Sequence, residues 1–213
     1  FPAAGRMMQG DGQGTFDDVT VRAHLLDVVE VPYDNVTEFP VFFRTLNMRH
    51  ENGKGLAHGD LNGDGYVDLI GSNSSGAIFE GGKLVPIETS ETHPLGSAPG
   101  PIFLWLQGSG ENHWITLRLK GRMAIDGSGS NADGIGARVY VKTTLEDREE
   151  PLTQVQEVCA GSSYLSMNSI DLEFGLGRAS IVDEVFIRWP SGRTQVLKDL
   201  PADRVMVVTE PEA

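Results

Sequence analysis

The chain has 213 residues, which is enough for one large or two modest domains with a sizeable core. Its net charge of -13 argues against nucleic acid as a partner and suits solubility, cation binding or a basic partner surface. The single cysteine, Cys159, excludes an internal disulfide, and no run approaches the roughly 18 apolar residues of a membrane-spanning helix.

Residues 1–108 are expected to form short strands and turns, in keeping with the 26 glycines and 11 prolines of the whole chain. We expect a strand over residues 15–21 after a Gly/Asp-rich turn, and then irregular connections with one or two strands over 25–43. An acidic segment at 60–68 is expected to have a strand on each side. It is followed by a hairpin over 77–87 that turns at Gly81 and Gly82, a loop over 88–100 and a buried strand over 101–106.

The best domain boundary lies at residues 108–112, so we assign one domain to residues 1–108 and a second to 109–213. In the second domain, apolar and polar residues alternate more cleanly, and the segments recur about every 8–12 residues, as in a β-sandwich or barrel. The expected strands cover residues 114–119, 137–141, 155–158, 183–189, 193–197 and 205–208, with a hairpin turn at residues 190–192. No helix of convincing length is expected, so the predicted fold class is all-β.

The acidic segment carries oxygen-bearing side chains on alternate residues, which a tight loop can turn toward one point. Ca²⁺ accepts six to eight oxygen ligands, so this spacing predicts a calcium site. Gly63 and Gly65 would supply the positive-φ turns that wrapping an ion requires. The expected ligands are the side chains of Asp60, Asn62, Asp64 and Asp68 and the backbone carbonyl of Tyr66.

Two other structures are alternatives to a calcium-binding loop between two strands. An EF-hand needs a bidentate Glu at the twelfth loop position and a helix on each side. Counted from Asp60, the twelfth position is Gly71, and the flanking segments resemble strands. The remaining alternative is a hairpin rich in Asx-turns that binds no ion.

Other polar clusters are weaker candidates for chemistry. His50, Glu51 and His58 lack the spacing of a zinc motif, and the serine-rich turns at residues 127–130 and 161–163 show no nucleophile elbow. Asn35 and Asn73 fit the glycosylation triplet, which often arises by chance. No catalytic residue is therefore assigned.

A few residues of the second domain are candidates for a ligand or interaction surface, each with a structural alternative. Asn131, Asp133 and Arg138 either line a ligand or interface pocket, or Asp133 simply caps a bulge. Arg188 with Trp189 forms either an interface anchor or a cation–π pair on the domain's own surface. Cys159, within a strand pattern, is expected to be a small buried hydrophobe. The interaction candidates are Asn131, Asp133, Arg138, Arg188 and Trp189.

Two family resemblances follow from these motifs. Residues 54–73, with Gly55-Leu56-Ala57-His58-Gly59-Asp60 followed by Asn62-Gly63-Asp64-Gly65 and Asp68, resemble an FG-GAP (VCBS-type) repeat, the calcium-binding blade of integrin-like β-propellers. Residues 10–20 look like the tail of a preceding repeat. The resemblance implies a partial β-propeller before the second domain.

Residues 112–210 resemble the ASPIC/UnbV domain, which usually follows such repeats at the C-terminus. The matching blocks include residues 112–115, Asn131-Ala132-Asp133-Gly134-Ile135-Gly136, Gly161-Ser162-Ser163, Phe174-Gly175-Leu176-Gly177 and Arg188-Trp189-Pro190-Ser191-Gly192. The family includes a secreted acidic cartilage protein of animals and many exported bacterial proteins. The resemblance therefore predicts the architecture of the chain but indicates little about its function.

The expected function is a noncatalytic Ca²⁺-binding β module for protein or surface interaction and assembly. We expect it to be secreted, periplasmic or at the cell surface, as a fragment or subunit that docks on another protein chain, with carbohydrate as an alternative ligand. The other function considered is an accessory subunit of a propeller-type enzyme such as a sugar lyase. That function needs convergent acid/base groups, which no spacing in the sequence indicates.

Overall fold

A computed structural model describes residues 7–10, 14–23, 25, 53–73, 76–77, 79–80, 83–84, 97–98, 102–108, 110–145, 148 and 150–212. Asn35, His50 and Glu51 lie outside the described residues, as does nearly all of the apolar stretch 25–43. The described part contains no helix long and apolar enough to cross a membrane.

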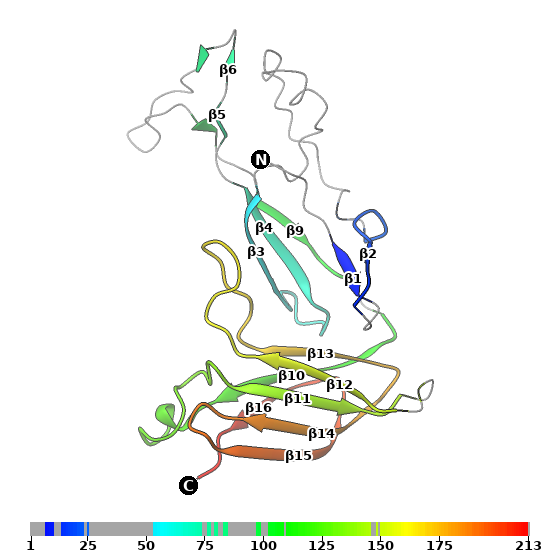
Figure 1. The fold of residues 1–213 in the computed structure, drawn as a ribbon, viewed down its shortest axis with the longest axis vertical. Coiled ribbons are helices and arrows are strands. Elements are labelled where there is room, and N and C mark those ends of the chain that lie inside the picture. The colour runs from blue at the N-terminus through cyan, green and yellow to red at the C-terminus, as the bar shows by residue number, and fades with distance from the viewer. Residues whose placement is uncertain are drawn as a thin grey trace. The chain divides into compact units, whose positions relative to one another are not determined.

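The chain forms two compact units (Figure 1). The first unit comprises Phe1–Leu56 and Ile70–Trp105, and the second comprises Ala57–Leu69 and Leu106–Ala213. The acidic turn therefore belongs to the same unit as the C-terminal part of the chain.

The N-terminal strands are short and pair antiparallel. Two of the pairs agree with the expected turn before residue 15 and with the central part of the expected hairpin over 77–87. Ala77 instead pairs with Ser97, which lies within the expected loop over 88–100. The first expected strand is shorter than residues 15–21. The three pairs are β1 (Met8–Gly10) with β2 (Phe16–Asp18), β6 (Phe79–Glu80) with β7 (Lys83–Leu84), and β5 (Gly76–Ala77) with β8 (Ser97–Ala98).

The acidic turn connects two strands of a three-stranded sheet. Its order is β3 (Gly53–Gly59), β4 (Asp68–Asn73) and β9 (Ile102–Trp105), so the prediction that the turn joins two strands is confirmed. The expected buried strand at residues 101–106 is only half buried, since Phe103 is buried while Ile102 and Leu104 are exposed. A propeller blade has four strands, and this sheet does not establish one.

The second unit contains two larger sheets. The first has the order β13 (Leu172–Gly177), β10 (His113–Lys120) and β16 (Arg204–Thr209). The second has the order β12 (Leu152–Glu157), β11 (Arg138–Thr143), β14 (Ile181–Arg188) and β15 (Thr194–Pro201). One short 3₁₀ turn, η1 (Arg122–Ala124), follows β10. The all-β prediction is confirmed.

One hydrophobic core joins the inner faces of these two sheets. Alternate residues such as Ile115 and Leu117 on β10, and Val139 and Val141 on β11, are fully buried in the same cluster. Two sheets that share a core in this way form a β-sandwich, and none of the sheets formed by the described residues closes into a barrel. The parallel pairing of β10 with β16 was not predicted, because a long-range partner leaves no mark in local alternation.

Two residue-level expectations are wrong. Cys159 is exposed, because Val158, the residue before it, takes the inward position. Trp189 is 3% exposed and packs in the core, and its indole N–H donates to Gln195 Oε1 at 3.1 Å. Trp189 is thus not a surface anchor, whereas Arg188 beside it is exposed.

Candidate functional site

The acidic turn, residues 60–68, is built on two glycines in the left-handed region. Gly63 has φ of 79° and Gly65 has φ of 86°, which confirms the expectation of positive φ at both positions. A side chain at Gly65 would also overlap the ring of Trp114, whereas Gly63 faces open space. The sequence needs glycine at Gly65 for two independent reasons, which are the backbone conformation and the contact with β10.

The carboxylate of Asp60 accepts hydrogen bonds from the backbone of the turn itself. Its Oδ1 accepts from the N–H groups of Gly63 at 2.7 Å and Asp64 at 3.2 Å, and its Oδ2 accepts from Gly65 N–H at 2.9 Å. These bonds close the turn around one side chain. Asp60 therefore fixes the path of the backbone in this structure.

Asn62 and Asp64 form a second layer of local contacts. The side-chain amide of Asn62 donates to Asp64 Oδ2 at 3.0 Å, and Asn62 Oδ1 accepts from Asp64 N–H at 3.0 Å. Asp64 Oδ1 accepts from Tyr66 N–H at 2.9 Å. This Asx-turn pattern is the one that the ion-free alternative predicts, and it is also compatible with a cation, because each carboxylate oxygen has more than one acceptor site.

Asp68 differs from the other acids of the turn because it is completely buried. Its Oδ2 accepts from Leu61 N–H at 2.9 Å, and its Oδ1 accepts from Gln107 N–H at 2.8 Å. A buried carboxylate needs such partners to offset its lost hydration. Asp68 thus joins the start of the turn to the segment that follows β9.

The turn is held against the sandwich by contacts that span more than 100 residues of sequence. The N–H of Asp60 donates to Glu173 Oε1 at 2.9 Å, and the N–H of His58 donates to Asn168 Oδ1 at 3.2 Å. In return, Ser169 N–H donates to the carbonyl of His58 at 2.8 Å. Glu173 and Asn168 were missed from the sequence, where the only signal is a glutamate inside the apolar run of β13.

Beside the turn, the buried Glu173 lies next to His58, whose side chain is partly exposed. Glu173 is 8% exposed, and its Oε2 lies 3.6 Å from His58 Nδ1. Neither atom has a hydrogen-bond partner. The distance is within range of an ion pair only when His58 is protonated.

The turn offers the donor types that Ca²⁺ prefers: three carboxylates, one amide oxygen and one backbone carbonyl. In the described part of the chain, however, no three His, Cys, Asp or Glu side chains are grouped so as to hold a metal ion. The kinds of ligand fit the ion, but the carboxylates point to N–H groups rather than to one common point. The structure shows the turn in this closed arrangement.

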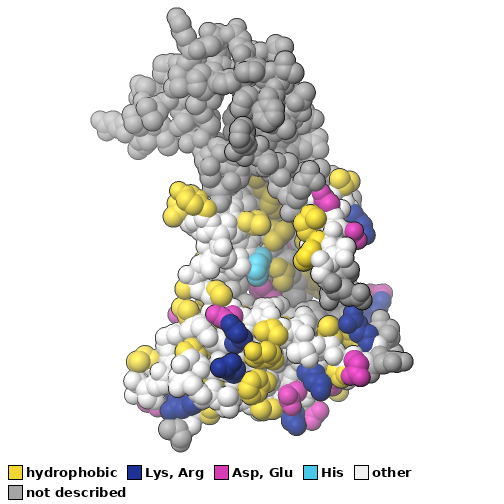
Figure 2. Space-filling view, viewed as in Figure 1, with side chains coloured by type: hydrophobic (Ala, Val, Ile, Leu, Met, Phe, Trp, Pro, Cys, Tyr) yellow, Lys and Arg dark blue, Asp and Glu magenta, His cyan; other side chains and the backbone are white. Residues whose placement is uncertain are grey.

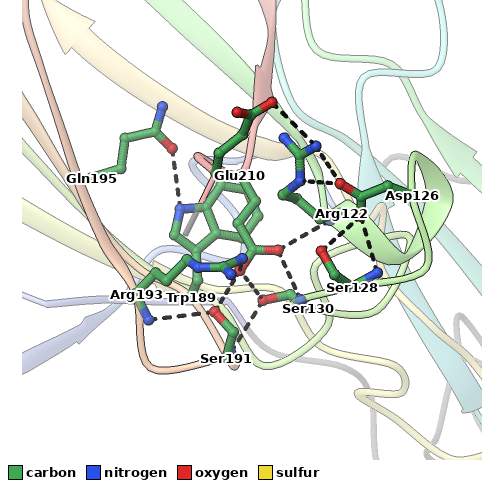
Figure 3. A network of polar contacts seen from close by, with 10 residues as sticks. Arg122, Asp126, Ser128, Ser130, Trp189, Ser191, Arg193, Gln195 and Glu210 are labelled. Atoms are coloured by element: carbon green, nitrogen blue, oxygen red, sulfur yellow. Dashed lines mark hydrogen bonds and ion pairs between the residues drawn. The ribbon is translucent and has the colours of Figure 1, made fainter.

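A second buried carboxylate, Glu210, is surrounded by polar groups that donate to it (Figure 3). It is 1% exposed, and its Oε2 accepts from the N–H groups of Arg122 at 3.0 Å and Ser130 at 2.7 Å. Its Oε1 accepts from the hydroxyls of Ser130 and Ser191, and Arg193 Nη1 lies 3.5 Å away. The glutamate thereby joins β16, the 121–135 loop and the hairpin turn after β14.

The hydrogen bonds around Glu210 outweigh its burial in setting its pKa. Burial alone would raise the pKa of this carboxyl, but the donors from Ser191, Arg122 and Ser130 lower it from 4.5 to about 2. Glu210 is therefore ionised at neutral pH. Its role is to stabilise the loop arrangement at this end of the sandwich.

The interaction candidates fall into two groups in the structure. Asn131 closes its own loop, since its side chain donates to Ile135 O and accepts from Ile135 N–H, both at 2.8 Å. Asp133 is exposed in the same loop. Arg138 and Arg188 are direct cross-strand partners on β11 and β14, and both are exposed on the outer face of the four-stranded sheet.

Comparison with known proteins identifies the C-terminal part of the chain. Residues 127–213 match the family described as ASPIC and UnbV. The match covers the larger part of the resemblance placed at residues 112–210 and does not reach the expected repeat at residues 54–73, which stays a prediction. No curated protein matches the chain. The C-terminal part of the chain is therefore an ASPIC/UnbV domain.

Proposed function

We propose that this chain is a noncatalytic Ca²⁺-binding β module for protein or surface interaction and assembly. In this proposal the turn holds one ion, through Asp60, Asn62, Asp64, Asp68 and the carbonyl of Tyr66, and the ASPIC/UnbV domain supplies a recognition surface. Extracellular concentrations of free Ca²⁺ suit a short loop of this type, so the proposed location is outside the cytoplasm.

The observation that carries the proposal is the charge balance of the turn. Asp60, Asp64 and Asp68 place three negative charges within nine residues, and among the described residues no Lys or Arg side chain forms an ion pair with any of them. Backbone N–H groups stabilise each carboxylate but do not cancel its charge. A divalent cation would remove the repulsion that remains.

The attachment of the turn to the sandwich supports a link between ion binding and recognition. Asp60 supplies a proposed ligand from its side chain, while its backbone N–H bonds to Glu173 on β13. Order imposed on the turn would therefore extend to a strand of the ASPIC/UnbV domain. Tyr66 adds a second link, because its hydroxyl donates to the carbonyl of Asn112 at 2.8 Å.

The proposal is tested by thermal unfolding of the chain in Ca²⁺ and in chelator. Added Ca²⁺ is expected to raise the melting temperature of the parent chain and not that of Asp64→Ala. Glu150→Ala serves as the matched control, because Glu150 is an exposed acid outside the turn. An equal response of the parent and Asp64→Ala would show that the turn is not the calcium site.

A further inference from the structure

The outer face of the four-stranded sheet carries an unusual row of apolar side chains. The outer face of an antiparallel sheet is ordinarily polar where the inner face supplies the core. Here four apolar residues, one on each strand, form a continuous row in which each is the direct cross-strand partner of the next. In spatial order they are Val155 on β12, Tyr140 on β11, Phe186 on β14 and Val196 on β15.

This apolar row is accessible to solvent. Val155 is 52% exposed and Val196 is 49% exposed, while Tyr140 and Phe186 are partly exposed between them. The two rings contact each other with centroids 5.8 Å apart. Figure 2 shows a band of hydrophobic side chains on this face with basic side chains on both sides of it.

Charged rows lie on each side of the apolar row. On one side, Arg138 pairs with Glu157 at 2.9 Å, and Arg188 is the cross-strand neighbour of Arg138. On the other side, Lys198 lies 3.7 Å from Glu184, which is also the cross-strand neighbour of Lys142. The two charged rows together have four basic and two acidic side chains, although the whole chain has a net charge of -13.

Two basic side chains on this face are available to pair with a binding partner. Among the described residues, neither Arg188 nor Lys142 forms an ion pair, and both are exposed. They lie on opposite sides of the apolar row. A ligand seated on the row could thus place a carboxylate on either side while its apolar groups cover the centre.

We propose that this face binds an acidic, extended segment of another protein, with apolar side chains on the Val155–Tyr140–Phe186–Val196 row and carboxylates at Arg188 and Lys142. Four strands spaced about 4.8 Å apart give a row of roughly 14 Å, which an extended segment covers with four or five residues. The inference rests on the proposed interaction function but does not depend on calcium.

The charge of the face argues against a second copy as its occupant. Two such faces packed together would bring a net charge of about +2 against +2, which like-charge repulsion disfavours. A polyanionic sugar would satisfy the basic residues but would leave the apolar row without a matching surface. An acidic protein segment satisfies both features at once.

The test uses the full chain, labelled with ¹⁵N, and a six-residue peptide of alternating glutamate and leucine. Added peptide is expected to shift the amide resonances of the outward-facing residues on β11 and β14. Arg188→Glu is expected to weaken binding about tenfold or more. Arg204→Glu, which changes an exposed arginine on β16 of the other sheet, is the control and should bind as the parent does. Phe186→Ser tests the apolar row independently and is expected to weaken binding as well.

Several results would overturn the inference. These are no shifts at millimolar peptide, equal binding of a lysine–leucine peptide, unchanged binding by Arg188→Glu, or dimerisation of the chain through this face. Binding of a heparin-derived hexasaccharide that Phe186→Ser does not weaken would assign the face to sugars instead. The calcium response is measured separately, so failure of this inference is distinguishable from failure of the proposed function.

Discussion

The acidic turn and the Glu210 network differ in the groups that compensate the negative charge of their carboxylates. Around Glu210, two backbone N–H groups, two hydroxyls and a guanidinium surround a single carboxylate. In the turn, three carboxylates share backbone N–H groups and one amide, with no basic side chain paired to them among the described residues. The chain thus contains one carboxylate site whose charge is fully compensated by neighbouring donors and one whose charge is not.

This difference explains why only the turn is proposed to take a cation. The pKa of Glu210, at about 2, shows that the protein's own donors already favour its charged form. A cation placed there would compete with Arg193 for little gain. In the turn, a cation would offset charge that nothing else in the described structure offsets.

The largest expected effect comes from the buried acid of the turn. Asp68→Ala would leave the N–H groups of Leu61 and Gln107 without their acceptor, at a cost of about 3 kcal/mol in the local free energy of opening. Amide hydrogen exchange at Leu61 and Gln107 measures this loss. Unchanged protection of both amides in Asp68→Ala would show that Asp68 does not hold the turn together.

The two glycines of the turn form a matched pair for the next test. Gly63→Ala adds a side chain in open space at positive φ and is expected to cost about 1 kcal/mol. Gly65→Ala adds the same strain and a collision with Trp114, for a total of roughly 3 kcal/mol. Amide hydrogen exchange across residues 60–68 distinguishes the two variants. An equal loss of protection in both would contradict the packing of the turn on β10.

Glu210 tests the electrostatically complete site. Because the folded-state pKa lies near 2 and the usual value is 4.5, Glu210 contributes stability above about pH 4.5 and loses it as the pH falls toward 2. Glu210→Gln is expected to cost about 2 kcal/mol at neutral pH and to flatten this acid dependence. Urea unfolding from pH 7 to pH 3, followed at amides of β14, measures both effects.

The control for this variant is Glu212→Gln. Glu212 lies two residues away and its side chain is 84% exposed, so its loss should leave the pH profile unchanged. An identical profile for the parent and Glu210→Gln would show that the network does not favour the ionised carboxylate.

The smallest effect is expected at Arg193. Its guanidinium is 3.5 Å from Glu210, which four other donor groups already hold, so Arg193→Met should cost only about 0.5 kcal/mol. The same urea measurement applies. A loss as large as that of Glu210→Gln would mean that the ion pair, rather than the N–H and hydroxyl donors, sets the stability of this site.

Local sequence patterns predicted the local parts of this structure. Alternation located β10, β11, β14, β15 and β16, and the glycines at 63 and 65 predicted the backbone of the turn. These features depend on a residue and its near neighbours. The ASPIC/UnbV resemblance was likewise carried by short motifs and is confirmed by the match at residues 127–213.

Features that depend on distant partners could not be predicted. Asp60 and Glu173 are 113 residues apart, and nothing in either segment indicates the other. The outward position of Val155 and the exposure of Cys159 follow from the register of β12 against β11, which local alternation leaves open. Trp189 was misplaced for the same reason, because its burial depends on how the two sheets face each other.

Direct titration of the chain with Ca²⁺ by isothermal calorimetry tests the central claim that the turn needs a cation to complete its charge balance. The expected result is one ion bound per chain with a dissociation constant at or below about 1 mM, abolished in Asp64→Ala and retained in Glu150→Ala. No binding by the parent chain at millimolar Ca²⁺, or equal binding by Asp64→Ala, would contradict it.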